Sequence, residues 1–471
     1  METKGDITIN LHGPSRYDAA KGAVTVTRRD VRILLLEGVH PSAVQRLQSE
    51  GFSVDSRPKS IPHAELVEII PQYHVLGIRS KTQVNQEVIE ASKGSLMCIC
   101  CFCIGTDQVD LKFATISGIP VFNSPFSNTR SVAELAIAEI IMLSRKAAHR
   151  SMQMHSGRWE KVATGCFEVR GKVLGIIGYG HVGTQLSTLA ESLGMRVVFY
   201  DHAPKLCLGN ASSMQSLDEL LESADFVSLH VPLTAETRHM ISAPQINKMK
   251  RTACLLNLAR GECINVDDAA EALKSGRIAG LAADVYPSEP LENGTGFVSC
   301  LQGCPNTILT PHIGGSTEEA QAAIGLEVAD RIVSLLDSGS PIQSVNFPQV
   351  DIPKERNRLR IVNVHDNVPG VLATLNTILR DHNISAQVRP ASSSFFHSSC
   401  APRLSCRCLT LPQVCGTNDH VGYFMCNGAS TCPRPPALLT RVAVDTDKAV
   451  EVRDAIAVCK FSRRTRIIHP K

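Results

Sequence analysis

The sequence predicts an α/β protein with two doubly wound parallel sheets and a smaller C-terminal α+β module. Short apolar runs, each suited to a buried strand, alternate with stretches of helical periodicity over residues 31–128 and again over 129–316. A glycine-rich turn at 178–183 follows one of these runs and opens a helix. The chain has 471 residues, a length that accommodates about three domains.

Apolar runs mark the strands that we expect in both blocks. In the first block they lie within 31–38, 74–80, 96–102 and 119–123. Ser131 and Glu134 form a capping-box pattern that opens a long apolar helix and divides the two blocks. The second block has runs followed by polar or glycine loops, as in sheets covered on both faces. They lie at 172–180, 195–201, 224–232, 253–261, 278–290 and 306–315.

The two ends of the chain differ from this pattern. Residues 1–30 are polar and aperiodic, which predicts a flexible N-terminal extension. Residues 347–357 are a Pro- and charge-rich linker, after which 358–471 begins as strand, turn and helix. Irregular Ser-, Cys- and Pro-rich stretches at about 388–415 and 427–438 interrupt this module, and we expect them to be insertions of little structural value.

Composition excludes several classes of protein. The net charge of +3 argues against a dedicated nucleic-acid binder, and no apolar run approaches the ~18 residues of a membrane span. The polar N-terminus lacks the apolar core of a secretion signal, so we expect a cytoplasmic protein with reduced thiols. Of the 17 cysteines, the two clusters at 98–103 and 400–432 lack the separate C-x-x-C pairs of a structural zinc site, and no metal is expected.

The turn Gly178-Tyr-Gly180-His-Val-Gly183 predicts a dinucleotide site. Its three glycines suit a tight turn, a close approach to a pyrophosphate and close packing of helix on strand. Asp201 ends the next apolar run, where a carboxylate accepts hydrogen bonds from the ribose hydroxyls and repels a 2′-phosphate. The cofactor is therefore expected to be NAD rather than NADP, with a glycine turn of another α/β protein as the alternative.

Three polar residues follow later strands of the second block and suit the oxidation of a 2-hydroxy acid. Arg260 can hold the substrate carboxylate bidentately, and His312 can take the hydroxyl proton. Glu289 can orient that imidazole and raise its pKa. Taken singly, each is as easily a solvated loop residue, so the prediction depends on their occurring together after a dinucleotide turn.

Long stretches of the chain resemble the D-isomer-specific 2-hydroxyacid dehydrogenases, in particular members with a C-terminal ACT domain. The similar segments include GIRSKT, CFCIGTDQVDL, GKVLGIIGYGHVGTQLS, NLARG, DVYPSEP and LTPHIGGSTEEAQ. The resemblance implies that a Rossmann NAD domain, 129–316, is inserted in a flavodoxin-like substrate domain made of 31–128 and 317–346. It also implies a cofactor-binding set comprising Gly178, Gly180, His181, Val182, Gly183, Asp201, His230, Ala259 and Asp284.

The resemblance further implies a phosphorylated substrate, 3-phospho-D-glycerate, oxidised to 3-phosphooxypyruvate as the first step of L-serine biosynthesis. Arg79, Ser80, Lys81 and Asn128 are the implied substrate-binding residues. Lys81 departs from the Arg that we expect there, and Cys100 replaces an expected Gly and would crowd a loop near the substrate. The alternatives are a sister enzyme acting on glyoxylate or 2-oxoglutarate, and a nucleotide-sensing scaffold without catalysis.

The C-terminal module resembles ACT domains that bind L-serine between paired copies. His365, Asn367 and Asn383 match the effector-binding residues, so feedback inhibition by serine is expected if the interrupted module folds. The family also implies a homo-oligomer, either a dimer or a tetramer.

Overall fold

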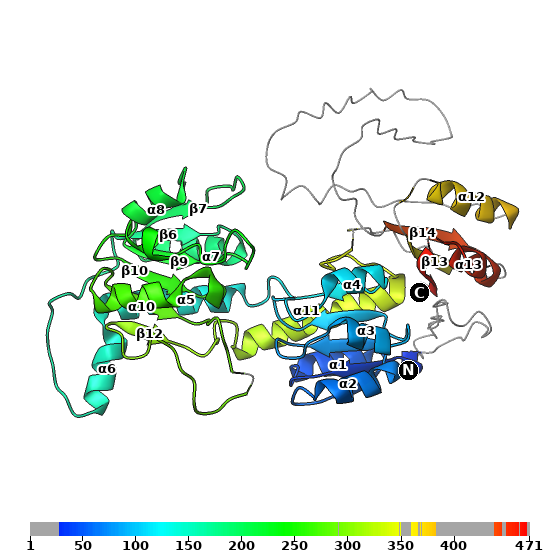
Figure 1. Cartoon of the computed structure of the whole chain (residues 1–471), viewed down its shortest axis with the longest axis horizontal. Helices are drawn as coiled ribbons and strands as arrows, with labels where there is room; N and C mark the ends of the chain where they lie inside the picture. Colours follow the sequence, from blue (N-terminus) through cyan, green and yellow to red (C-terminus); the bar gives the residue numbers. More distant parts are fainter. Residues whose placement is uncertain are drawn as a thin grey trace, which may run out of the picture.

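The computed structural model describes residues 28–290, 292–347, 349, 359–365, 368, 370–382, 438–444, 449–460 and 462–468. Two α/β lobes lie side by side, and a small antiparallel sheet flanks one of them (Figure 1). The predicted class, two doubly wound parallel sheets, is confirmed.

The first lobe holds a parallel sheet in the order β2-β1-β3-β4-β5, a flavodoxin-like order. Its strands are β1 (Arg32–Leu35), β2 (Ser53–Ser56), β3 (Val75–Ile78), β4 (Cys98–Cys101) and β5 (Val121–Phe122). Helices α1 (Pro41–Ser49), α2 (His63–Ile69), α3 (Gln86–Ala91) and α4 (Leu111–Ile116) connect them. β3 and β4 are apolar throughout, and β1 is apolar after Arg32, because both faces of the sheet are covered, and these strands form the core of the lobe.

A distant part of the chain completes this lobe. Helix α11 (Glu318–Ser338) packs on α1 and on β4 and buries apolar residues such as Val328 and Ile332 in the same core. Arg28 of the turn η1 (Arg28–Asp30) is also buried, and it pairs with Glu50 and with Asp337 of α11. The last three residues of the predicted N-terminal extension therefore belong to the packed lobe, and residues 1–27 lie outside the described part.

The second lobe holds seven parallel strands in the order β12-β11-β10-β9-β6-β7-β8, the Rossmann order with β6 at the switch point. The strands are β6 (Val173–Ile177), β7 (Arg196–Tyr200), β8 (Ser212–Ser213), β9 (Phe226–Leu229), β10 (Cys254–Asn257), β11 (Gly280–Ala283) and β12 (Thr307–Leu309). The helices are α5 (Thr129–Arg145), α6 (Ala147–His155), α7 (His181–Ser192), α8 (Leu217–Ser223), α9 (Ala243–Ile246) and α10 (Val266–Lys274).

Helices α5 and α11 begin where the chain passes between the lobes. The predicted capping box is wrong, because α5 begins at Thr129 and Ser131 lies within its first turn. The Ser131 hydroxyl instead lies 2.9 Å from the hydroxyl of Thr317, which caps α11. Glu134 pairs with Arg130 on the helix surface. A side-chain contact thus joins the two crossover helices near their N-termini, where the chain passes between the lobes.

The C-terminal sheet is antiparallel in the order β14-β13-β15, with β13 (Leu359–His365), β14 (Leu438–Val444) and β15 (Ser462–Ile468). Helices α12 (Val371–Asp381) and α13 (Ala449–Ala457) accompany it. The Arg464 guanidinium donates to the carbonyls of Gly94 and Leu96, at 2.7 and 2.6 Å, and so attaches β15 to the loop before β4. The predicted insertion at 388–415 lies outside the described residues, as does the one at 427–438 up to the start of β14.

The cysteine-rich strand β4 packs into the core. Cys98, Cys100 and Cys101 are fully buried, and burial raises the pKa of the Cys100 and Cys101 thiols well above the ordinary value. The expectation that Cys100 crowds a substrate loop is wrong, because it lies within the strand opposite Gly77 and its sulfur faces Cys98. These thiols act as small apolar side chains.

No helix in the described ranges is both long enough and apolar enough to span a bilayer.

Candidate active site

The glycine-rich turn joins β6 to α7 at the carboxyl edge of the Rossmann sheet. Gly178 has a φ of +93° and lies so close to the backbone of His230 that a Cβ would fall 2.7 Å from its carbonyl oxygen. A Cβ on Gly183 would meet the Gly178 carbonyl at 2.4 Å. At Gly180, by contrast, a Cβ would meet no atom within 4 Å. The turn is therefore closed on its protein side and open where α7 presents its N-terminal N–H groups, a geometry that suits a pyrophosphate.

Asp201 follows β7 beside this turn. Its carboxylate accepts hydrogen bonds from the backbone N–H groups of Tyr179 at 2.9 Å and of Ala203 at 3.0 Å. The side chain is 7 % exposed, and Lys205 approaches it at 3.9 Å. A carboxylate has lone pairs for further donors, so Asp201 is held in place with acceptor capacity for ribose hydroxyls.

His230 follows β9 on the opposite side of the turn. Its Nε2 lies 2.9 Å from the Ser228 hydroxyl, and burial lowers its pKa to about 4. The imidazole is therefore neutral at physiological pH and adds no positive charge beside a bound nicotinamide nucleotide. His181, the first residue of α7, meets Phe126 of the other lobe edge to face, with ring centroids 4.3 Å apart.

His312 and Glu289 form an ion pair at the far end of the same sheet edge. His312 Nδ1 lies 2.8 Å from Glu289 Oε2, while Glu289 Oε1 accepts the Tyr286 N–H at 3.1 Å. The bond to Glu289 is the largest effect on His312 and raises its pKa, against an opposing effect of burial. Burial is the largest effect on Glu289 and would raise its pKa, but the contact with His312, the Tyr286 N–H and the charge of Arg260 together outweigh it, and the net shift is downward.

The turn that carries His312 is held by a buried carboxylate. His312 has a φ of +55°, a left-handed conformation that a β-carbon disfavours. Asp284 after β11 accepts hydrogen bonds from the N–H groups of Ile313 and Gly314, both at 2.8 Å, and from the Thr310 hydroxyl at 2.6 Å. Both carboxylate oxygens of Asp284 therefore bind this turn, in addition to any contact with the cofactor that the resemblance implies.

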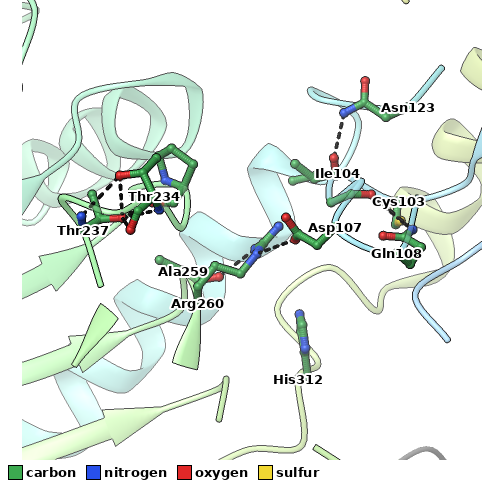
Figure 2. A network of polar contacts seen from close by, with 12 residues as sticks. Cys103, Ile104, Asp107, Gln108, Asn123, Thr234, Thr237, Ala259, Arg260 and His312 are labelled. Atoms are coloured by element: carbon green, nitrogen blue, oxygen red, sulfur yellow. Dashed lines mark hydrogen bonds and ion pairs between the residues drawn. The ribbon is translucent and has the colours of Figure 1, made fainter. Parts of the chain in front are cut away.

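Arg260 reaches from the Rossmann lobe toward the other lobe (Figure 2). Its Nη1 donates to the Ala259 carbonyl at 2.7 Å, and its Nε lies 3.6 Å from the Asp107 carboxylate of the first lobe. A Cβ on Gly105 would fall 3.0 Å from Arg260 Nη2. Figure 2 shows the imidazole of His312 pointing toward Arg260 and Asp107. The geometry thus brings two predicted catalytic groups to the boundary between the lobes.

The Arg79–Lys81 segment follows β3 and forms a turn at the carboxyl edge of the first sheet. The Glu37 carboxylate after β1 accepts the backbone N–H groups of Lys81 at 3.0 Å and Thr82 at 2.8 Å. Arg79 is half-buried, and Ser80 and Lys81 are exposed. The turn is therefore rigidly anchored through its backbone while its two cationic side chains remain available to an anion.

Asn128 lies at the first crossover between the lobes, just before α5, and close to Gly315 at the second crossover, just before α11. Its Oδ1 is buried with no hydrogen-bond partner among the described residues, and a Cβ on Gly315 would fall 2.5 Å from its Nδ2. A buried acceptor without a donor is costly. This observation favours a ligand or a change of lobe angle that supplies the donor.

Sequence reasoning and structure differ in the supporting residues. Glu37, Asp107 and Gln108 were not among the predicted site residues, although each follows an apolar run at the carboxyl edge of its sheet. Of the predicted effector residues, His365 is buried at the end of β13. Asn367 and Asn383 lie outside the described residues.

Comparisons with known proteins agree with this geometry. Residues 137–314 match the model of the D-isomer specific 2-hydroxyacid dehydrogenase NAD binding domain. D-3-phosphoglycerate dehydrogenase of Dictyostelium discoideum is 53% identical over 358 residues, which cover 76% of this chain and 88% of that protein. The Escherichia coli enzyme of the same name is 47% identical, with 79% of this chain and 90% of that protein covered.

Solved structures show the same two-lobed arrangement. A protein from Thermus thermophilus is 31% identical with a TM-score of 0.61, over 67% of this chain and all (100%) of that one. A glyoxylate reductase from Paecilomyes thermophila is 27% identical with a TM-score of 0.60, over 67% and 98% of the two chains. The chain belongs to the D-isomer-specific 2-hydroxyacid dehydrogenase family, whose members of this kind are NAD-dependent oxidoreductases.

Proposed function

We propose that the chain is a D-3-phosphoglycerate dehydrogenase, which oxidises 3-phospho-D-glycerate with NAD to 3-phosphooxypyruvate, the first step of L-serine biosynthesis. The observation that carries the proposal is the His312–Glu289 pair, 2.8 Å apart, at the same lobe boundary as Arg260. Oxidation of a 2-hydroxy acid requires these groups: a cation that binds the carboxylate and a base that takes the hydroxyl proton. The relatives of that name at about 50% identity support the choice of substrate.

Each group then has one role in the reaction. Arg260 binds the substrate carboxylate and presents the C2 hydroxyl to His312, whose imidazole accepts the hydroxyl proton. Glu289 stabilises the imidazolium that results and fixes the ring through Nδ1. NAD, when bound at the glycine turn, supplies the acceptor for the hydride that leaves C2. Closure of the lobes about the Ser131–Thr317 contact would exclude water from this step.

The phosphate of the substrate is assigned to the basic turn after β3. Arg79 provides a fork of donors and Lys81 a point charge, while Glu37 fixes the backbone that carries Lys81. The carboxylate of Glu37 is 8 % exposed and already accepts two N–H groups, so it leaves the two cations free for an external anion.

Steady-state kinetics test this function against its closest alternative. We expect NADH formation from 3-phospho-D-glycerate with a kcat/KM at least about 100-fold above that for D-glycerate, because one phosphate contributes charge-assisted bonds to two cations. Reduction of glyoxylate or 2-oxoglutarate at the higher efficiency would instead favour the sister activity. A chain that binds NADH yet turns over none of these substrates would be a scaffold.

We also propose that L-serine inhibits the enzyme through the C-terminal module. The supporting observations are its antiparallel β14-β13-β15 sheet and Arg464, which attaches β15 directly to the loop before β4. His365 ends the central strand, where an effector site is expected. The test is activity on 3-phospho-D-glycerate with and without millimolar serine; equal rates would exclude serine control.

The homo-oligomer that we propose is supported by apolar side chains exposed on α6 and the loop after it. Trp159 is 78% exposed and Met152 71%, and Met154, Val162 and Phe167 are exposed beside them in the sequence. Exposed apolar side chains that gather on one segment are typical of a contact surface. A Trp159→Glu variant should lower the oligomer size in light scattering. Every cysteine in the described ranges is a free thiol, which supports the cytoplasmic location that we propose.

A further inference from the structure

We propose that Asp107 is a gate on Arg260: without substrate its carboxylate pairs with the guanidinium, and it must be displaced before the substrate carboxylate binds. The inference rests on the proposed function, and it concerns a residue to which the motifs assigned no role. It makes Asp107 a positioning residue that sets the affinity for anionic substrates without taking part in proton or hydride transfer.

The first observation is the contact itself. Arg260 Nε lies 3.6 Å from Asp107 Oδ2, and the two side chains come from different lobes (Figure 2). In the described part of the chain, Asp107 is the carboxylate of the other lobe that pairs with the Arg260 guanidinium. The guanidinium also donates a hydrogen bond to the carbonyl of its own neighbour, Ala259. The Asp107 carboxylate therefore holds the position of a counter-ion beside the group that is expected to bind a carboxylate.

The second observation is exposure. The Asp107 side chain is 74% exposed, whereas that of Arg260 is 30% exposed. Exposed ion pairs are weak, so a ligand with several charges can displace this one. A rotation of the Asp107 side chain suffices for release, and the backbone of its loop need not move.

The third observation is that the loop is fixed to the basic turn. Cys103 Sγ lies 3.5 Å from the Arg79 carbonyl and 3.2 Å from the Gly105 carbonyl, and Gln108 Nε2 donates to both carbonyls. Asp107 therefore keeps its place relative to Arg79 when the lobes move. The Arg79–Lys81 turn, which is expected to bind the phosphate, and Asp107 therefore approach Arg260 together when the lobes close.

Electrostatics give the sign of the effect. The substrate carries a carboxylate and a phosphate, so a fixed negative charge beside Arg260 opposes its entry both by repulsion and by competition. Ions screen such an exposed charge, with a Debye length of about 10 Å at 0.1 M. Removal of the Asp107 charge should therefore strengthen substrate binding, and most strongly at low ionic strength.

The test is the Asp107→Asn variant, which keeps the shape and removes the charge. We expect KM for 3-phospho-D-glycerate to fall about two- to five-fold at low salt, with kcat within about two-fold and the difference lost above about 0.5 M KCl. The matched control is Glu87→Gln, which neutralises an exposed carboxylate on α3 of the same lobe. An unchanged KM, or a KM that falls equally in both variants, would overturn the gate, and so would a raised KM.

A second measurement does not require turnover. Malonate, a dicarboxylate that cannot be oxidised at C2, is titrated by calorimetry into the NADH complexes of wild type and Asp107→Asn. Tighter binding by the variant supports the gate even if 3-phospho-D-glycerate proves not to be the substrate, and equal or weaker binding overturns it. Failure of the wild type to form NADH from 3-phospho-D-glycerate contradicts the proposed function alone.

Discussion

The imidazole Nδ1 of His312 lies 2.8 Å from Glu289 Oε2, although the two residues are 23 positions apart in the sequence. Glu289 is itself fixed by the Tyr286 N–H. The Tyr286 hydroxyl shares its proton between the carbonyls of Ala283 at 2.9 Å and Thr310 at 3.0 Å, which end or follow adjacent strands. The pair is thus anchored to the sheet edge. With Nδ1 occupied, Nε2 is the ring nitrogen left to accept a proton from a substrate.

His312→Ala should abolish most of the activity while leaving the cofactor site intact. General-base catalysis contributes about 10²- to 10⁴-fold, so kcat should fall by that factor. The NADH dissociation constant, measured by fluorescence, should change less than about two-fold. His63→Ala removes an exposed histidine on α2 and serves as the control; turnover by the His312 variant equal to this control would exclude His312 as the base.

Glu289→Gln should move the pH profile in a defined direction. The bond to Glu289 raises the His312 pKa, and oxidation requires the neutral imidazole, so kcat/KM of the wild type rises as pH passes through that pKa. Without the carboxylate the His312 pKa falls, and the acidic limb of the profile should shift to lower pH. The plateau should also fall, because the imidazolium is less stabilised.

The control for this profile is Glu222→Gln, which neutralises an exposed position of α8 in the same lobe. The control should leave the limb in place. If Glu289→Gln left the limb in place as well, or moved it to higher pH, Glu289 would not be the group that sets the His312 pKa.

Asp201→Asn should weaken the preference for NAD. The carboxylate is held by the N–H groups of Tyr179 and Ala203, which the amide oxygen can still accept in part. Loss of the charge removes charge-assisted bonds to the ribose, and kcat/KM for NAD should fall by about 10-fold. Activity with NADP should rise relative to NAD, since the repulsion of a 2′-phosphate is gone. An unchanged NADP-to-NAD ratio would contradict the role of Asp201.

Glu139→Gln should stabilise the protein in a pH-dependent manner. Glu139 of α5 is 1% exposed, and neither of its carboxylate oxygens has a hydrogen-bond partner among the described residues. Burial, with a smaller effect of Asp284, raises its pKa from 4.5 to about 8. Between these values the unfolded chain is ionised and the folded chain protonated, so the wild type loses stability as pH rises, and the loss is complete above about pH 8.

The variant has no such ionisation. Its advantage in unfolding free energy should therefore grow from near zero below about pH 4 to at most about 5 kcal/mol above pH 8. Urea unfolding at several pH values measures this difference. An advantage that is constant with pH, or greatest in acid, would show that Glu139 is not protonated in the folded state.

The sequence alone predicted the strands that are apolar on both faces, because their runs are continuous and end in turns. It missed the edge strands β2 and β8, since SVDS and the pair Ser212–Ser213 are polar and short. It also placed the start of α5 too late, because Ser131 resembles a cap while its hydroxyl contacts Thr317, a residue far along the chain.

Candidate site residues within a family motif could be named from the sequence, whereas those defined by contacts between distant segments could not. Arg260, Glu289 and His312 follow strands within recognisable segments. Glu37 binds the backbone of Lys81, which lies 44 positions further along the chain. Asp107 contacts the side chain of Arg260 in the other lobe. No local pattern records such a contact, so these roles required the folded structure.

The most direct test of the account is a crystal structure of the complex with NADH and 3-phospho-D-glycerate. We predict the substrate carboxylate on Arg260, with the His312 imidazole within hydrogen-bonding distance of the C2 hydroxyl and Glu289 still on Nδ1. A substrate bound in the reverse direction, or an imidazole of His312 remote from C2 in the closed enzyme, would contradict the central claim.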